Sequence, residues 1–451
     1  MKKNVYLVLF VVVHLHVSAI ATEIVVGYYP YWGHDVLPAS QLDLSRLTHV
    51  KHAFAWPAAD GRIEHSPALL YPELNDRIHK SDRSILLALG GWGNSAGFAP
   101  TTAHPDTRNN FITNVVSFCL EHNYDGVDLD WEYPSTAQQR DNMTLLVKEM
   151  RDAFSRLTRP QPLLITMAVT AGNWNGQWLD YDELKKYVDW FGCMTYDFHG
   201  DWTDHAGHNS PLYMSGGDTD GSVNSGFKYL TQTRGLAPEQ ILLGVPFYGR
   251  GFNASRLYGP SSGTGSEHGY KEIPALIDAG WTRHWDDVAK VPYIMNPQKT
   301  KLISYDDTLS VRLKAEYAVN KKTKGVMIWA LGQDLIDGRQ PLLRAVADPV
   351  LNQTKVGKRA ADKSDQIEVV STIPNPFNSG TTITVRLPKP EHLSFALLDV
   401  RGRTIKKLFD GPIDGGEHSF QFNAHDLTSG IYLCHFSTNT FSKTRKITHL
   451  K

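Results

Sequence analysis

The chain has 451 residues, enough for more than one domain, and its 41% hydrophobic, 21% charged and 11% aromatic residues are typical of globular proteins. The formal net charge is -1, from 46 basic and 47 acidic side chains. Such a balance gives no field that would attract nucleic acid or an anionic membrane. We therefore expect no nucleic-acid partner. The charge balance is compatible with a neutral polymer as partner.

The first 21 residues have the layout of an export signal. Lys2 and Lys3 precede an almost continuous apolar run over residues 5–17, and small residues follow up to Ala21. A transmembrane anchor is the alternative interpretation, but the run is too short to cross a bilayer comfortably. We predict that residues 1–21 are a signal peptide and that the protein is secreted.

The cysteines and histidines indicate neither a disulfide framework nor a metal site. The chain has 3 cysteines, and Cys119 and Cys193 lie in apolar runs, which is typical of small buried side chains. The 19 histidines are scattered and show no metal-binding spacing. We therefore expect no metal and no cofactor.

Strand-like apolar runs alternate with helix-like amphipathic segments from residue 23 to about residue 348. The expected strands are residues 23–29, 49–55, 84–89, 126–131, 163–171, 188–196, 240–247 and 325–330. This alternation predicts an α/β fold, a (β/α)8 TIM barrel over residues 22–348, with functional residues at the C-terminal strand ends. A doubly wound open sheet is the alternative, but no glycine-rich dinucleotide turn follows the first strand.

Three further regions complete the predicted organisation. Residues 251–304 lack a simple helical pattern and predict a small subdomain inserted in the seventh crossover. Residues 349–367 combine basic and small polar side chains, which is typical of a linker. Residues 368–451 show short alternating strands separated by turn residues, and these predict an antiparallel β-sandwich.

The most informative segment, residues 125–134, carries Asp128, Asp130 and Glu132 at alternate positions. Strand side chains alternate between faces, so the three carboxyl groups point the same way. Buried together they must share protons, which raises the pKa of the outermost group. Glu132, nearest the barrel mouth, is therefore a candidate general acid near neutral pH. A solvated acidic edge strand is the alternative, but the apolar residues between the acids argue against it.

The spacing D-x-x-D-x-D-x-E over residues 125–132 resembles the signature of glycoside hydrolase family 18, the chitinase family. Other motifs follow in the family's order, near the ends of expected strands: GYY at 27–29, AFA at 53–55, GGW at 90–92, MTYD at 194–197, PFYGR at 246–250 and MIWA at 327–330. Residues 251–304 resemble the α+β insertion that deepens the groove of family chitinases. The family's endo-N-acetylglucosaminidases usually lack this insertion.

This resemblance implies retaining hydrolysis of β-1,4 bonds in chitin and N-acetylglucosamine oligomers, assisted by the substrate's own acetamide. Glu132 would protonate the glycosidic oxygen, and Asp130 would orient and stabilise the acetamide. Asp128 would exchange a proton with Asp130, and Tyr196 would hydrogen-bond the acetamide. The residues implied to line the cleft, with Trp329 as its floor, are Tyr28, Phe54, Gly91, Trp92, Tyr133, Met194, Asp197, Tyr248, Arg250, Met327 and Trp329.

One position departs from the family pattern, and two other functions stay open. Ala88 stands where the family usually has a serine hydroxyl beside the acidic column, which puts the pH optimum in doubt.

A non-catalytic chitin-binding lectin is one alternative, although lectin-like members typically lose the glutamate that is retained here as Glu132. Hydrolysis of peptidoglycan or of N-glycan N-acetylglucosamine linkages is the other.

The C-terminal region resembles the sorting domain of type IX secretion. The motifs are IPNPFN at 373–378, DVRGR at 399–403 and SGIY at 429–432, followed by a basic strand before the terminus. The resemblance implies a bacterial secretion machinery as partner and an extracellular or cell-surface location on a Gram-negative bacterium. A chitin-binding β-sandwich is the alternative, but the aromatic residues of this region are typical of a core. We expect the protein to be a monomer.

Overall fold

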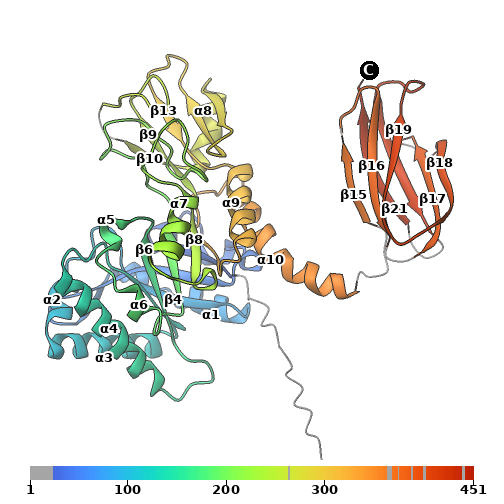
Figure 1. Ribbon diagram of the computed structural model, residues 1–451. Coiled ribbons are helices and arrows are strands. Elements are labelled where there is room, and N and C mark those ends of the chain that lie inside the picture. The colour runs from blue at the N-terminus through green and yellow to red at the C-terminus, as the bar shows by residue number, and fades with distance from the viewer. Residues whose placement is uncertain are drawn as a thin grey trace, which may run out of the picture. The chain divides into compact units, whose positions relative to one another are not determined.

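The structure, a computed structural model, describes residues 24–262, 265–362, 368–373, 375–387, 390–399, 403–438 and 442–450. The chain forms two compact units, Met1–Asn352 and Gln353–Lys451, which we describe separately (Figure 1). The predicted signal peptide and residues 363–367 of the predicted linker lie outside the described residues.

A closed barrel of parallel strands forms the first unit. Its strands are β1 (Ile24–Pro30), β2 (His49–Pro57), β4 (Ser84–Gly90), β5 (Gly126–Asp130), β6 (Leu164–Thr170), β7 (Trp190–Met194), β8 (Ile241–Pro246) and β14 (Gly325–Trp329). They pair in the order β1-β14-β8-β7-β6-β5-β4-β2, and pairing of β1 with β2 closes the ring. The short β3 (Ile63–His65) adds to β2 in antiparallel fashion. The predicted (β/α)8 barrel is therefore confirmed, and the open doubly wound sheet is wrong.

Helices cover the outside of the barrel. They are α1 (Pro72–Lys80), α2 (Phe98–Ala103), α3 (Pro105–Glu121), α4 (Ala137–Ser155), α5 (Asn173–Gly176), α6 (Tyr181–Leu184), α7 (Val223–Lys228), α9 (Thr308–Asn320) and the first part of α10 (Pro341–Asp362). Short 3-10 turns lie at Tyr31–Gly33, Ala39–Gln41, Leu44–Arg46, Pro67–Leu69, Pro238–Gln240 and Tyr270–Glu272. A π-helical turn lies at Tyr229–Thr233. Helix α4 begins after Thr136, whose hydroxyl accepts a hydrogen bond from the Gln139 N–H and caps the helix.

The main core lies between the strands and these helices. Val127 and Leu129 of β5, for example, pack in one cluster with Phe111 of α3 and Leu146 of α4. A second, smaller apolar cluster fills the barrel interior near the strand ends and includes Tyr28. The site residues are thus held between two packed layers.

The predicted insertion is an antiparallel sheet with one helix, located between β8 and α9 (Figure 1). Its strands are β9 (Tyr248–Phe252), β10 (Ser266–Gly269), β11 (Thr282–Asp286), β12 (Val291–Met295) and β13 (Leu302–Ser304), in the order β10-β9-β13-β12-β11. Its helix is α8 (Ile273–Asp278). Because β9 begins at Tyr248, the PFYGR motif belongs partly to the insertion and does not simply end the seventh barrel strand.

The second unit is a β-sandwich, as predicted. One sheet has the order β15-β16-β19 and the other β18-β17-β20-β21. The strands are β15 (Glu368–Ile373), β16 (Gly380–Leu387), β17 (Glu391–Leu398), β18 (Thr404–Ile413), β19 (Gly416–Asn423), β20 (Gly430–Ser437) and β21 (Ser442–His449). Ile383 from one sheet and Phe395 and Phe436 from the other share one core. Phe377, Phe422 and Tyr432 also lie in this core, which matches the expectation from sequence.

Two other sequence expectations can be compared with the fold. Helix α10 extends to Asp362, so most of the segment expected as an irregular linker, residues 349–367, is helical. Cys119, Cys193 and Cys434 are buried and free, in agreement with the absence of a disulfide framework. No helix among the described residues is both long and apolar enough to cross a membrane.

Candidate active site

Strand β5 carries a column of carboxyl groups to the C-terminal end of the barrel. Asp128 and Asp130 alternate with Val127 and Leu129, so the acids face the interior while the apolar side chains pack against the helices. Both acids are buried. Glu132 follows the end of the strand. The structure thus brings the three acids together in the order that the spacing predicts.

The loop after β4 holds the upper part of this column. The Gly91 N–H donates to the Asp130 carbonyl oxygen over 2.8 Å, and the Glu132 N–H donates to the Ser95 hydroxyl over 2.9 Å. Gly90 has a φ of 107°, and a Cβ there would lie 2.2 Å from the Asp130 carbonyl oxygen. Glycine at position 90 is therefore required for β4 and β5 to approach closely where Glu132 is positioned.

Asp128 is surrounded by donors at the bottom of the column. The Tyr28 hydroxyl donates to Oδ2 over 2.5 Å, and the Thr166 hydroxyl donates to Oδ1. Nζ of Lys51 lies 2.7 Å from Oδ1, with both side chains fully buried. Ala88 is the strand partner of Asp128 and offers no hydroxyl. Asp128 is therefore held by Tyr28, Thr166 and Lys51 without a hydroxyl from position 88.

The two upper acids have raised pKa values. Burial, followed by the nearby charges of Glu132 and Asp128, raises the pKa of Asp130 well above its ordinary value. Oδ1 of Asp130 is buried without a hydrogen-bond partner, as suits a neutral carboxyl group. Burial also raises the pKa of Glu132, to about 7. A hydrogen bond with Tyr133 lowers this pKa, but burial has the larger effect. Glu132 can therefore give or take a proton near neutral pH.

Aromatic rings form a floor beside these acids. The rings of Trp329 and Phe54 stack at 5.7 Å between centroids, and Tyr28 meets Trp329 edge-on at 5.2 Å. Met194, at the end of β7, is part-buried against the same cluster. Met327 is expected in the cleft from the motif match, but it is fully buried, with its Sδ 3.8 Å from Lys51 Nζ. It supports the floor from below.

A polar wall connects β7 to the inserted sheet. Nε of Arg250 donates to Oδ1 of Asp197 over 2.8 Å. The Asn209 amide joins the two elements, since its oxygen accepts from the Asp197 N–H and its nitrogen donates to the Tyr248 carbonyl. Burial, together with Asp130, raises the pKa of Tyr196 well above its ordinary value, so its hydroxyl remains a hydrogen-bond donor.

Exposed tryptophans surround the floor and the wall. Trp92 is 79% exposed and Trp174 is 78% exposed, with Trp174 meeting Tyr133 edge-on at 6.1 Å. Trp202 packs against the Arg250 guanidinium, and Trp32 lies 6.3 Å from Phe54. The sequence motifs include Trp92 but not Trp32, Trp174 or Trp202. Large exposed apolar rings of this kind mark a binding surface.

A carboxyl group with a pKa near neutrality, a buried acid beside it and aromatic rings at the mouth of a (β/α)8 barrel are the features of an enzyme that cleaves glycosidic bonds. Comparison with known sequences agrees with this class. Residues 24–334 match the family model of glycosyl hydrolases family 18, and the chain belongs to this family. Residues 371–449 match the model of the secretion system C-terminal sorting domain.

Several related proteins have names that indicate a similar activity. The chain is 31% identical over 313 residues to probable chitinase 2 of Drosophila melanogaster, covering 64% of this chain and 63% of the fly protein. It is 30% identical to chitinase 1 of Aphanocladium album, covering 67% and 79% of the two chains. A Group II chitinase domain of Ostrinia furnacalis, solved with the oligosaccharide (NAG)5, is 27% identical with a TM-score of 0.68, covering 74% and 97%.

Proposed function

We propose that the barrel hydrolyses β-1,4 glycosidic bonds in chitin and N-acetylglucosamine oligomers, with Glu132 as general acid and then general base. The observation that carries this proposal is the placement of Glu132, whose pKa is raised to about 7, at the barrel mouth beside the stacked rings of Trp329 and Phe54. The flat faces of pyranose rings suit such a floor. The names of the similar proteins favour chitin as the substrate.

The arrangement of the acids favours attack by the substrate's acetamide. A protein nucleophile would be a second carboxylate about 5–5.5 Å from the acid, across the scissile bond. Asp130 is the last residue of β5 and lies only two positions before Glu132, so it approaches the sugar from a similar direction. Asp197 forms an ion pair with Arg250. The N-acetyl oxygen is then the group available to attack the anomeric carbon.

The reaction proceeds in two steps. Glu132 gives its proton to the glycosidic oxygen while the acetamide oxygen bonds to the anomeric carbon and the leaving sugar departs. Asp130 and Tyr196 hold the acetamide, which becomes positively charged. Water then attacks the anomeric carbon, Glu132 accepts its proton, and the acetamide is restored. Two displacements at one carbon retain its configuration.

The test is hydrolysis of defined N-acetylglucosamine oligomers, with product lengths followed in time and Glu132→Gln as the inactive control. We expect chain-length-dependent cleavage by the parent enzyme. Binding without cleavage by the parent enzyme would favour the lectin alternative. Cleavage of peptidoglycan or N-glycans in preference to chitin oligomers would favour the other hydrolase activities.

We also propose that the β-sandwich directs the enzyme through type IX secretion to the exterior or surface of a Gram-negative bacterium, after removal of residues 1–21. The match of residues 371–449 to the sorting-domain model supports this role. The core position of its aromatic residues gives little support to a separate carbohydrate-binding face. In a host with this secretion system, deletion of the sandwich should retain the enzyme in the periplasm.

A further inference from the structure

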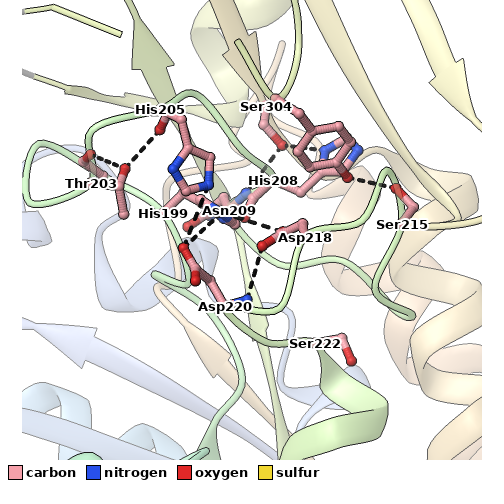
Figure 2. A network of polar contacts seen from close by, with 12 residues as sticks. His199, Thr203, His205, His208, Asn209, Ser215, Asp218, Asp220, Ser222 and Ser304 are labelled. Carbon is pink, nitrogen blue, oxygen red and sulfur yellow. Dashed lines mark hydrogen bonds and ion pairs between the residues drawn. The ribbon is translucent and has the colours of Figure 1, made fainter. Parts of the chain in front are cut away.

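Four side chains outside the acidic column converge within the loop between β7 and α7 (Figure 2). They are His199, His205, Asp218 and Asp220, and one ligand atom from each lies within 4.8 Å of all the others. Nε2 of His199 is 3.3 Å from Oδ2 of Asp218 and 3.3 Å from Oδ2 of Asp220. Nε2 of His205 is 3.6 Å from Oδ2 of Asp220.

Both imidazoles are oriented with Nε2 toward the centre of the cluster. Nδ1 of His199 donates to the His208 carbonyl oxygen over 2.9 Å, and Nδ1 of His205 donates to a carboxylate oxygen of Asp204 over 2.8 Å. With the proton on Nδ1, each Nε2 presents a lone pair. Histidines that bind metals are held in this way, through a carbonyl or carboxylate on the other ring nitrogen.

The inner part of the cluster is buried, and two of its polar atoms have no hydrogen-bond partner outside the cluster. The side chain of His199 has no exposed surface, and that of Asp218 is 3% exposed. Nε2 of His199 and Oδ2 of Asp218 face each other at 3.3 Å, and neither atom has a hydrogen-bond partner outside the cluster. Buried polar atoms without partners are rare and call for an explanation.

We propose that His199, His205, Asp218 and Asp220 form a binding site for one divalent transition-metal ion, with zinc as the preferred ion. Zinc bonds of about 2.0–2.2 Å to nitrogen and oxygen place neighbouring tetrahedral ligands about 3.3–3.6 Å apart. The three separations given above, 3.3, 3.3 and 3.6 Å, fall in this range. Two imidazoles favour zinc over calcium or magnesium, which prefer oxygen ligands.

The site is structural. Four protein ligands fill a tetrahedral zinc site and leave no position for a reacting water. The backbone N–H of Asp220 holds the other carboxylate oxygen of Asp218 at 2.9 Å, which fixes that ligand (Figure 2). The metal joins the start of the loop, near Asp197 and Trp202, to its end before α7. Its role is therefore to fasten one wall of the cleft, and it does not depend on the identity of the substrate.

The alternative to a metal ion in this cluster is a second proton on the His199 imidazole. Burial alone lowers the pKa of His199, but the adjoining Asp218 reverses the effect, so the pKa of His199 is raised overall. An imidazolium between two carboxylates would also balance part of the charge. Metal binding and simple protonation differ in one measurable quantity, the metal content of the folded protein.

The test uses the full-length chain, stripped with a chelator and titrated separately with Zn²⁺, Co²⁺, Ca²⁺ and Mg²⁺. His205→Ala combined with Asp220→Asn removes the two part-exposed ligands and spares the buried ones, so folding is least disturbed. His268→Ala is the matched control, because His268 pairs with Glu272 outside the cluster. We expect one zinc per chain, an intense visible spectrum of tetrahedral Co²⁺, and a melting temperature raised by several degrees with zinc.

In the double variant we expect at least a tenfold loss of zinc affinity and no thermal response to zinc, whereas the control retains both. Less than stoichiometric zinc in the parent chain, or equal binding by the double variant, would overturn the proposal and leave protonation of His199 as the explanation. Preferential binding of Ca²⁺ or Mg²⁺ would also overturn it.

Discussion

Nζ of Lys51 lies 2.7 Å from Oδ1 of Asp128, and neither side chain has any exposed surface. The lysine belongs to β2 and the aspartate to β5, so this buried ion pair links two barrel strands that flank β4. Its positive charge compensates the lowest acid of the column. The groups that hold protons near neutral pH are then higher in the column, where the pKa values of Asp130 and Glu132 are raised.

Replacement of Lys51 should therefore be costly. Lys51→Met leaves the charge of Asp128 buried without compensation, and we expect a loss of about 3–5 kcal/mol in the free energy of unfolding. Urea denaturation at pH 7 measures this loss. The double variant Lys51→Met/Asp128→Asn should recover much of it, since no charge is then left unpaired. A loss below about 1 kcal/mol in the single variant would contradict the assigned pairing.

Replacement of Glu132 should separate binding from turnover. Glu132→Gln keeps the shape of the side chain but removes the transferable proton, so we expect kcat to fall by several orders of magnitude while oligosaccharide binding is retained. Steady-state kinetics and titration calorimetry with the same oligomer check both quantities. Retention of a tenth of the parent activity would show that another group donates the proton.

The same variant should change stability in a pH-dependent way. The pKa of Glu132 is raised from 4.5 to about 7 on folding, so the folded state holds this proton more tightly than the unfolded chain. The resulting stabilisation is complete below pH 4.5 and is lost as the pH rises to 7. Relative to the parent, Glu132→Gln should gain up to about 3 kcal/mol at pH 8 compared with pH 4. Denaturation midpoints at the two pH values test this, and an unchanged difference would contradict it.

Removal of the β-sandwich should leave hydrolysis intact. Because α10 ends at Asp362, a chain truncated after this residue keeps the whole helix. We expect normal turnover of soluble oligomers and unchanged adsorption to insoluble chitin, measured by pelleting. A clear loss of adsorption on truncation would instead identify the sandwich as a chitin-binding module.

Much of the fold could be predicted because the relevant patterns are local. Each barrel strand is a short apolar run, and the alternation of acids and apolar residues at 127–130 indicates which side faces inward. The boundary between the last barrel helix and the linker was harder to predict. The helical pattern of α10 continues to Asp362 through basic and small residues that are equally common in linkers.

The site was predicted where it rests on short motifs and missed where it rests on contacts between distant segments. Lys51 is a single charged residue in an apolar strand, and only the pairing of β2 and β5 with β4 brings it to Asp128. The proposed metal site has the spacing H-x5-H-x12-D-x-D over residues 199–220, which matches no compact ligand motif. Its histidines are brought together by the folding of a loop, which periodicity does not describe.

The proposed mechanism rests on attack at the anomeric carbon by the acetamide of the substrate and by no group of the protein. Proton NMR of the first products from an N-acetylglucosamine oligomer tests this most directly, with a matched oligomer deacetylated at the reacting sugar and with Asp130→Asn as a further control. We expect the β-anomer first, very slow cleavage of the deacetylated oligomer, and a loss in Asp130→Asn nearly as large as in Glu132→Gln. An initial α-anomer, or efficient cleavage at the deacetylated sugar, would contradict it.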